Sequence, residues 1–318
     1  MILICGIPSE KPTYLVIEAA KKSAVPHLVL NQLHLEGTYL RARVNSQDRK
    51  PILNGEIIID SEICDLANIS GVYNRMMDHH SLPAFQKSST QTNPDEAELT
   101  ESISRFHQTI QDWMEITPAR VMNCSSAMAS NCSKPYQAQL ILRTGFRVPG
   151  TLITNIPELV KDFLKEHPRV IYKSISAERS IVKELSQTDI PQLEKIRYLP
   201  TQFQEFIPGV DYRVHVVGDQ AFACKIITEA VDYRYAAAQE LDVQIQPTRL
   251  ARNIEQQCLM LSRLFKLPLC GIDLKCTPDG DWYCFEVNPM PAFSFYEQQT
   301  GQPIAMAIVH YLNQPASM

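Results

Sequence analysis

"GIDLKCTPDGDWYCFEVNPMP", residues 271–291, reads as two short strands joined by a tight turn. Asp279-Gly280 predicts a two-residue type I′ turn, because both central positions of that turn need positive φ and this dipeptide tolerates it. Pro278 and Asp281 would then close the turn as its outermost facing pair. The turn sets the register of the two strands, so it decides which side chains share a face.

Two carboxylates face each other in this register. Counting outward from the closing pair brings Asp273 directly opposite Glu286, where Cβ atoms lie about 4.5–5.5 Å apart and like charges are destabilising. Asn288 points to the same face as Glu286, and its opposite number Gly271 leaves room because it has no side chain. Two carboxylates and an amide carbonyl are the all-oxygen ligand set that Mg²⁺ prefers. We therefore expect a cation between the two acids.

An ordinary exposed hairpin is the alternative, in which Lys275 and solvent neutralise the acids. The apolar flanks LCGIDL and WYCFEV favour a hairpin that is buried on at least one side. Unpaired charge would be costly there, so the flanks favour the metal site.

The composition is that of a soluble globular protein with two or three packed units. Of 318 residues, 45% are hydrophobic and 20% are charged. The formal net charge of −5, with scattered Lys and Arg, gives no basic stripe for nucleic acid. No apolar run approaches the ~20 residues of a membrane helix, and the start MILICGIPSEKP lacks a signal-peptide pattern. We expect a cytoplasmic protein that binds neither nucleic acid nor membrane.

The nine cysteines contain no C-x-x-C pair and mostly lie in apolar stretches. This pattern is typical of small reduced core residues rather than of disulfides or zinc ligands. Residues 78–80, Asp-His-His, adjoin a polar stretch, and a surface loop is favoured there over a metal site.

Strand and helix patterns divide the chain into three units of α/β type, with α+β character in part. Residues 1–118 alternate strands and helices but contain no G-x-G-x-x-G, so a dinucleotide fingerprint is absent. Residues 119–200 form a smaller alternating unit, and residues 201–318 contain two hairpins around a long helix. The predicted ends of elements are a turn at Asp60-Ser61, a strand end at Arg75, a helix from Asn93 to Pro118, a helix capped by Ser133 and stopped by Gly145, a hairpin turn at Gly218-Asp219, and a helix from about Thr248 to Phe265.

The order of charged residues along the chain resembles the ATP-grasp superfamily, and within it the ligases related to ribosomal-protein glutamate ligase and the graspetide (microviridin-type) peptide ligases. The D…E-V-N-P pattern of the opening hairpin is its most specific part. The resemblance covers nearly the whole chain, with its motifs concentrated in residues 119–318. It implies an ATP-grasp fold in which residues 1–118 are a pre-ATP-grasp domain, 119–200 the small subdomain, and 201–318 the C-terminal subdomain with the Mg²⁺ site.

The resemblance also implies a binding site for ATP. Lys134 in NCSKPYQAQL and Lys173 in VIYKSIS resemble the two lysines that hold the α- and β-phosphates. Glu205 and Phe206 in QEFIP look like the segment whose backbone reads adenine, and Asp211 is similar to the acid that binds the ribose.

Catalytic and metal residues are implied in the same way. Arg213 and Arg234 resemble arginines that face the triphosphate and the acyl phosphate. Asp273, Glu286 and Asn288 match the ligands of one or two Mg²⁺ ions. A purely acidic face of the hairpin would repel a triphosphate. Magnesium would remove this repulsion by bridging the carboxylates to the phosphate oxygens.

One loop departs from the family pattern. The second lysine is followed in these ligases by a glycine-rich loop whose N–H groups approach the phosphates. Here the loop is SISAERSIV, residues 174–182, without glycine. Ser176 and its neighbouring serines offer hydroxyl donors instead. The segment YAAAQ after Arg234 is also less polar than in related ligases.

The resemblance implies a ligase that activates a carboxylate as an acyl phosphate and transfers it to an amine or hydroxyl group, with a peptide as one substrate. The N-terminal unit and Arg75 would help to form the acceptor site, and Phe293, Phe295 and Tyr296 either line it or belong to the core. A ligase for free amino acids or small metabolites and a non-catalytic ATP-binding regulatory protein are the alternatives. The relatives suggest a homodimer as a possible assembly.

Overall fold

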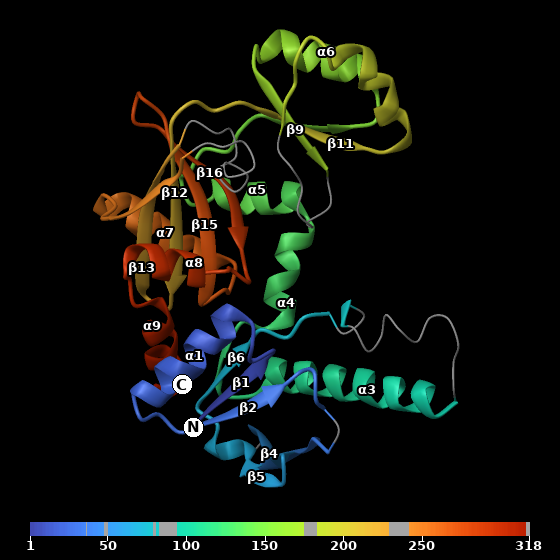
Figure 1. The fold of residues 1–318 in the computed structure, drawn as a ribbon, viewed down its shortest axis with the longest axis vertical. Coiled ribbons are helices and arrows are strands. Elements are labelled where there is room, and N and C mark those ends of the chain that lie inside the picture. Colours follow the sequence, from blue (N-terminus) through green and yellow to red (C-terminus); the bar gives the residue numbers. More distant parts are fainter. Residues whose placement is uncertain are drawn as a thin grey trace.

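The computed structural model describes residues 1–35, 37–47, 50–78, 81–82, 94–174, 183–228 and 242–315. Within this part of the chain, the strands form four sheets in three tiers (Figure 1). A small sheet lies at the top of the view, a five-stranded sheet in the middle, and the N-terminal sheets at the bottom.

The N-terminal tier is a parallel sheet with the strand order β2-β1-β6-β7. Its two central strands, β1 and β6, are fully buried, as expected for a parallel sheet whose two faces are covered, whereas the edge strands β2 and β7 are partly buried. An antiparallel meander, β3-β4-β5, extends from it, and the predicted turn at Asp60 and Ser61 lies between β4 and β5, where both residues have a positive φ. The elements are β1 (Ile2–Gly6), α1 (Lys11–Lys22), β2 (His27–Asn31), β3 (Tyr39–Gln47), β4 (Lys50–Ile59), β5 (Glu62–Asp65), η1 (Leu66–Asn68), β6 (Gly71–Asn74), α3 (Pro94–Ile116) and β7 (Arg120–Met122).

A short helical connection leads to the small sheet. This sheet is antiparallel, with the order β10-β9-β11-β8. One of its faces packs on α6 and η4 through Val160, Leu193 and Phe203. The elements are α4 (Ser125–Met128), η3 (Ala129–Cys132), α5 (Lys134–Leu142), β8 (Thr151–Thr154), α6 (Pro157–Glu166), β9 (Val170–Ser174), β10 (Lys183–Glu184), η4 (Ile190–Tyr198) and β11 (Thr201–Glu205).

The five-stranded sheet has the order β14-β13-β12-β15-β16 and is antiparallel throughout. One face packs on α5 and α7 through a core that includes Val214, Ile272 and Cys258. The C-terminal helix α9 returns to the N-terminal tier and packs on α1 in a second core. The elements are β12 (Val210–Val217), β13 (Gln220–Ile227), β14 (Gln244–Thr248), α7 (Arg252–Leu264), β15 (Leu269–Cys276), β16 (Trp282–Asn288), α8 (Ser294–Thr300) and α9 (Ile304–Asn313).

Some strand pairings cross the predicted domain boundaries, and one predicted helix start is wrong. The first sheet continues past residue 118, because β7 pairs with β6. The small sheet continues past residue 200, because β11 pairs with both β9 and β8. Thr248 belongs to a strand, so the helix expected from there begins at Arg252. The division of the chain into three domains remains a prediction.

Other predicted ends are confirmed. Ser133 caps α5 by accepting a hydrogen bond from the Tyr136 N–H, and Gly145 follows the helix with a φ of 90°. Gly218 and Asp219 form the two-residue turn between β12 and β13. The cap expected at Asn93 lies outside the described residues. Six of the nine free cysteines are buried, as expected for core residues. No described helix combines the length and the hydropathy needed to cross a membrane.

Candidate functional site

The turn of the opening hairpin differs from the predicted one. Gly280 has a positive φ of 88°, whereas Asp279 does not. The Gly280 N–H donates to the Thr277 carbonyl (3.0 Å), and the Thr277 N–H donates to the Asp281 carbonyl (2.9 Å). The connection is therefore a three-residue loop, a turn followed by a left-handed glycine, and the type I′ prediction is wrong.

The facing pair of acids is nevertheless confirmed. A three-residue loop alone would place Phe285 opposite Asp273 and turn Glu286 to the other face. A β-bulge corrects this shift, because Leu274 pairs with Cys284 while Asp273 pairs with Glu286. Phe285 is the extra residue on β16. The turn and the bulge each shift the register by one residue in opposite directions, so the count from the sequence reached the right pair.

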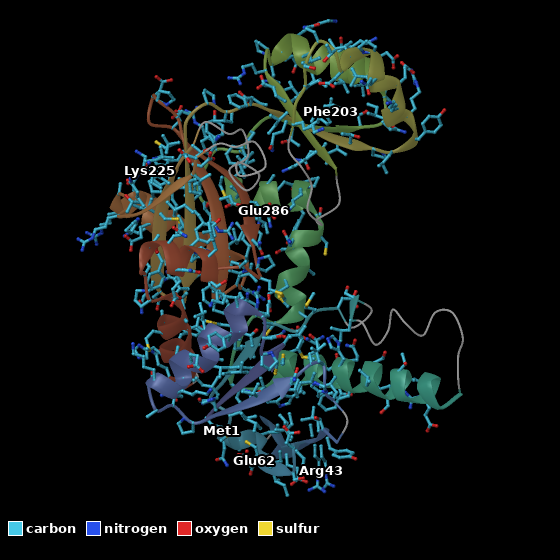
Figure 2. All side chains as sticks on the ribbon, viewed as in Figure 1. Met1, Arg43, Glu62, Phe203, Lys225 and Glu286 are labelled. Carbon is cyan, nitrogen blue, oxygen red and sulfur yellow. The ribbon has the colours of Figure 1, made fainter. Side chains whose placement is uncertain are left out.

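Each facing acid is paired with its own cation. Arg213 lies directly opposite Asp273 on β12, and its Nη1 donates to Asp273 Oδ1 at 2.6 Å. Lys134 Nζ, from the start of α5, donates to Glu286 Oε1 at 2.5 Å and to Asn131 Oδ1 at 2.9 Å. Figure 2 shows Glu286 at the β16 edge of the large sheet, the edge that lies next to α5. Two neighbouring elements thus supply positive charge to the acids, and the metal ion expected between them remains a prediction.

The alternative that Lys275 neutralises the two acids is not what the structure shows. Lys275 Nζ instead pairs with Asp211 Oδ1 at 3.2 Å. Burial by itself would raise the pKa of Glu286, but nearby Lys134, Lys173 and Arg213 lower the pKa below its ordinary value of 4.5. Glu286 is therefore ionised at neutral pH.

Asn288 and Gly271 face each other at the end of the hairpin, as predicted. The Asn288 Oδ1 accepts a hydrogen bond from the Met290 N–H at 2.9 Å. The space above Gly271 is filled, because a Cβ there would lie 2.1 Å from Arg213 Nη2. Glycine thus makes room for the guanidinium of Arg213.

Gln137 is a site residue that sequence reasoning missed. Its amide donates to the Val287 carbonyl (2.8 Å) and accepts from the Val287 N–H (3.0 Å). It lies three residues after Lys134, so both side chains leave α5 on one face toward β16. Gln137 binds the backbone of β16, and Lys134 contacts Glu286 on the same strand. The i, i+3 spacing from Lys134 was the sequence signal that could have indicated Gln137.

A cavity of about 520 Å³ lies between α5, the middle of β16 and the open face of the small sheet. Lys173 on β9 and Gln202 on β11 are direct cross-strand neighbours on that face, and Gln204 follows two residues later. The cavity is lined by Lys134, Pro135, Ala138, Ile141, Val148, Pro149, Gly150, Thr151, Ile153, Lys173, Gln202, Gln204, Cys284 and Phe285.

Two residues that line this cavity, Gln202 and Gln204, each have a buried Oε1 without a hydrogen-bond partner within the described part of the chain. The Gln204 Nε2 donates to Thr151 Oγ1 (3.1 Å), and the Thr151 hydroxyl donates in turn to the Pro149 carbonyl (2.9 Å). Because Thr151 uses its only proton on Pro149, it must accept from Gln204. This fixes the amide orientation and leaves the Gln204 carbonyl as the group without a partner.

The residues expected near adenine and ribose do not line this cavity. Glu205 Oε2 accepts from the Gly150 N–H at 3.1 Å, so it supports one wall from outside. The ring of Phe206 lies under the Arg169 guanidinium, 3.6 Å from its carbon. Asp211 is in the ion pair with Lys275. Ser176 and Arg234 lie outside the described residues.

The N-terminal tier contacts the loop that follows Asn288. Arg75, 5% exposed, donates to Glu10 (2.9 and 2.7 Å) and to the Pro291 carbonyl (3.1 Å). Asn123 donates to the Pro289 carbonyl at 2.6 Å. Arg75 therefore holds this loop, and its expected part in the acceptor site remains a prediction.

Of the three aromatic residues in question, Phe293 and Tyr296 belong to the core, being 0% and 8% exposed. Phe295 is 51% exposed and is the one of the three that is available to a ligand.

The sheet arrangement, with an open-faced small sheet above an acidic hairpin, defines a protein of the ATP-grasp class. A family model described as the RimK-like ATP-grasp domain matches residues 132–312. This match spans more than half of the chain, and the chain belongs to the RimK-like ATP-grasp family. The resemblance inferred from the sequence and the predicted fold class are confirmed.

Named relatives agree with this family. A probable alpha-L-glutamate ligase of Shewanella loihica is 26% identical over 226 residues, which cover 68% of this chain and 74% of that protein. A protein of the same name from Teredinibacter turnerae is 24% identical over 225 residues, covering 68% and 74%.

Solved structures show the same fold over nearly the whole chain. The macrocyclase MdnC of Microcystis aeruginosa, bound with precursor peptide MdnA, aligns with a TM-score of 0.75 and 24% identity over 98% of this chain and 99% of that one. The ATP-grasp ligase PsnB, complexed with minimal precursor, Mg and ADP, aligns with a TM-score of 0.77 and 23% identity over 98% and 97%.

Proposed function

We propose that this protein is an ATP- and Mg²⁺-dependent ligase that joins a carboxylate to an amine or hydroxyl group through an acyl phosphate. The observation that carries the proposal is the facing pair Asp273 and Glu286, with Glu286 ion-paired to Lys134, which lines the same cavity as Lys173. Opposed acids beside lysines match the needs of a bound metal polyphosphate, which carries both positive and negative charge.

The residues present fit Mg²⁺. Within the described residues, no group of three or more His, Cys, Asp or Glu side chains is arranged to hold a metal ion. Mg²⁺ does not require such a group, because it is usually held by one or two carboxylates together with substrate phosphates and water. Asp273 and Glu286 would supply the carboxylates and Asn288 an amide oxygen. When bound there, the ion neutralises phosphate charge and spreads the charge that develops as the phosphoryl group transfers.

The cavity fits an adenine nucleotide. The carbonyl oxygens of Gln202 and Gln204 are buried and lack a donor in the described structure, and buried acceptors are nearly always satisfied in native proteins. The exocyclic amine of adenine is such a donor, whereas guanine has a carbonyl oxygen at the same place. Lys134 and Lys173, which also line the cavity, would hold phosphate oxygens.

The reaction then follows from these positions. An oxygen of the substrate carboxylate attacks the γ-phosphorus of ATP, the bond to the bridging oxygen breaks, and ADP leaves. The amine or hydroxyl of the second substrate attacks the carbonyl carbon of the acyl phosphate, inorganic phosphate leaves, and the nucleophile loses its proton. Arg213, and Arg234 as a prediction from the sequence, would hold the phosphoryl oxygens during transfer.

We further propose that one substrate is a peptide. The structures of MdnC and PsnB that share this fold were solved with precursor peptides. The exposed Phe295, a few residues after the metal-binding end of β16, gives an apolar side chain for such a substrate. Residues 1–118 would serve as the pre-ATP-grasp domain, and the cytoplasm, which supplies ATP, is the expected compartment. A homodimer remains a hypothesis that the molar mass from light scattering tests.

The function is tested by incubating the protein with ATP, Mg²⁺ and peptides recovered with it. We expect ADP rather than AMP, a hydroxamate when hydroxylamine is added, and a mass change of a co-expressed peptide by mass spectrometry: loss of one water if both joined groups belong to the peptide, or gain of the second substrate less one water if they do not. AMP as the product would reject the acyl-phosphate route. Activity on free amino acids alone would reject the peptide substrate and favour the small-molecule ligase.

A further inference from the structure

His215 is a buried histidine that the proposed reaction does not use. It lies on β12 two residues after Arg213, so both side chains project from the same face of the strand. It is 1% exposed and lies directly opposite Gly271 on β15. His215 is therefore located behind Arg213, on the face of the sheet that carries the facing acids.

The hydrogen bond between the two side chains defines the state of the imidazole. The Nε of Arg213 lies 3.4 Å from Nε2 of His215. Because a guanidinium can only donate, His215 Nε2 must accept, and the ring proton is on Nδ1. Burial, and secondarily the charge of Arg213, hold the pKa of His215 well below its ordinary value of 6.5. The ring is thus a neutral acceptor at neutral pH.

The surroundings of His215 are unfavourable for the stability of the fold at one of its two ring nitrogens. Its Nδ1 is buried and has no hydrogen-bond partner within the described part of the chain. Buried N–H groups without partners are rare because each forfeits its hydrogen bonds to water. An apolar side chain at this position would avoid that cost, which points to a benefit from the Nε2 acceptor.

Three groups confine the Arg213 guanidinium together with His215. The Tyr296 ring centroid lies 4.8 Å from that of His215 and 5.6 Å from the Arg213 guanidinium carbon. On another side, a Cβ at Gly271 would lie 2.5 Å from that carbon, so the guanidinium packs directly on the backbone. Asp273 accepts from Nη1 at 2.6 Å.

We propose that His215 is a positioning residue that fixes the orientation of Arg213 toward the transferred phosphoryl group. This inference rests on the proposed function. Asp273 is also a proposed metal ligand, so a bound ion competes with Arg213 for its oxygens. His215 does not bind the metal, and its acceptor keeps the guanidinium in place when Asp273 is engaged elsewhere. A long arginine side chain would otherwise lose its orientation at the step that needs it.

The test compares binding of Mg·ADP and Mg·AMPPNP by isothermal titration calorimetry in two variants. His215→Phe keeps the ring against Tyr296 but removes the acceptor, and His215→Gln keeps an acceptor. We expect His215→Phe to weaken Mg·AMPPNP at least about tenfold, the loss of a hydrogen bond to a charged group, with less than about a threefold effect on Mg·ADP. His215→Gln should restore most of the difference. The preference for the triphosphate analogue is the readout that a structural role would not change.

His107→Phe is the matched control, because it makes the same substitution at a half-buried histidine of α3 in the N-terminal tier. It should leave both affinities unchanged. Equal weakening of both nucleotides by His215→Phe, or no weakening of either, would overturn the positioning role while leaving the proposed function intact. Failure of the wild-type protein to bind either nucleotide would overturn the proposed function and this inference with it.

Discussion

Glu286→Gln removes one charge from the facing pair at nearly constant volume. In the folded protein Glu286 is ionised, because nearby cations lower its pKa despite burial. The amide therefore takes away a full negative charge and one anionic ligand for Mg²⁺. We expect Mg²⁺-dependent ADP formation to fall by at least about 100-fold, which corresponds to about 2.7 kcal/mol of transition-state stabilisation.

The same substitution should affect stability little. It breaks the ion pair with Lys134, whose side chain is 17% exposed against 25% for Glu286. Lys134 keeps its contact with Asn131, and the loss of repulsion from Asp273 offsets part of the cost. The pair lies between the surface and buried extremes, so we expect a net loss of about 1 kcal/mol. The melting temperature should then fall by less than about 4 °C.

ADP release in a coupled assay and differential scanning fluorimetry measure the two effects. Asp281→Asn is the matched control, because Asp281 belongs to the same hairpin but pairs with the exposed Arg147 away from the site. It should keep full activity. A Glu286→Gln variant with more than half of the wild-type turnover would show that Glu286 is not a metal ligand. A drop of more than about 10 °C would show instead a mainly structural role.

Further predictions concern the same cluster. Asp273→Asn should abolish Mg²⁺-dependent turnover as Glu286→Gln does, and an active variant would contradict the ligand assignment. Because the pKa of Glu286 is lowered on folding, its contribution to stability is present above pH 4.5 and is lost as the pH falls through its folded value. When the melting temperature is measured against pH, it should therefore fall less steeply at acid pH in Glu286→Gln than in the wild-type protein. Gln137→Leu removes both hydrogen bonds to Val287 and should destabilise the fold by about 2 kcal/mol in urea unfolding, whereas an unchanged midpoint would reject its role in holding β16. Gln204→Leu should weaken ADP binding about tenfold in calorimetry. An unchanged affinity would show that the Gln204 side chain does not contact the adenine base.

The register of the hairpin shows what local sequence can and cannot decide. Asp273 and Glu286 were paired correctly, but by a count that used the wrong turn and ignored the bulge at Phe285. A bulge depends on tertiary contacts, and here the Cys284 N–H donates to the carbonyl of Arg147, which comes from another segment. No pattern within residues 271–291 carries that information.

Features set by one element were predictable, and features shared between elements were not. The Ser133 cap and the Gly218 turn follow from local chemistry and were predicted. The position of β11 in the small sheet depends on pairing with strands far away in the sequence. Its alternating pattern therefore predicted a strand but not the strands with which it pairs. The cavity residues Gln202 and Gln204 were missed for the same reason, since an isolated glutamine in a strand gives no sign of facing a cavity.

Isothermal titration of ADP into the metal-free protein, with and without Mg²⁺, tests most directly whether the facing acids hold a cation for the nucleotide. Binding that is at least about tenfold tighter with Mg²⁺, and that loses this dependence in Glu286→Gln, is the predicted result. Equal binding with and without the ion would contradict the account, because the two acids would then have no part in holding the phosphates.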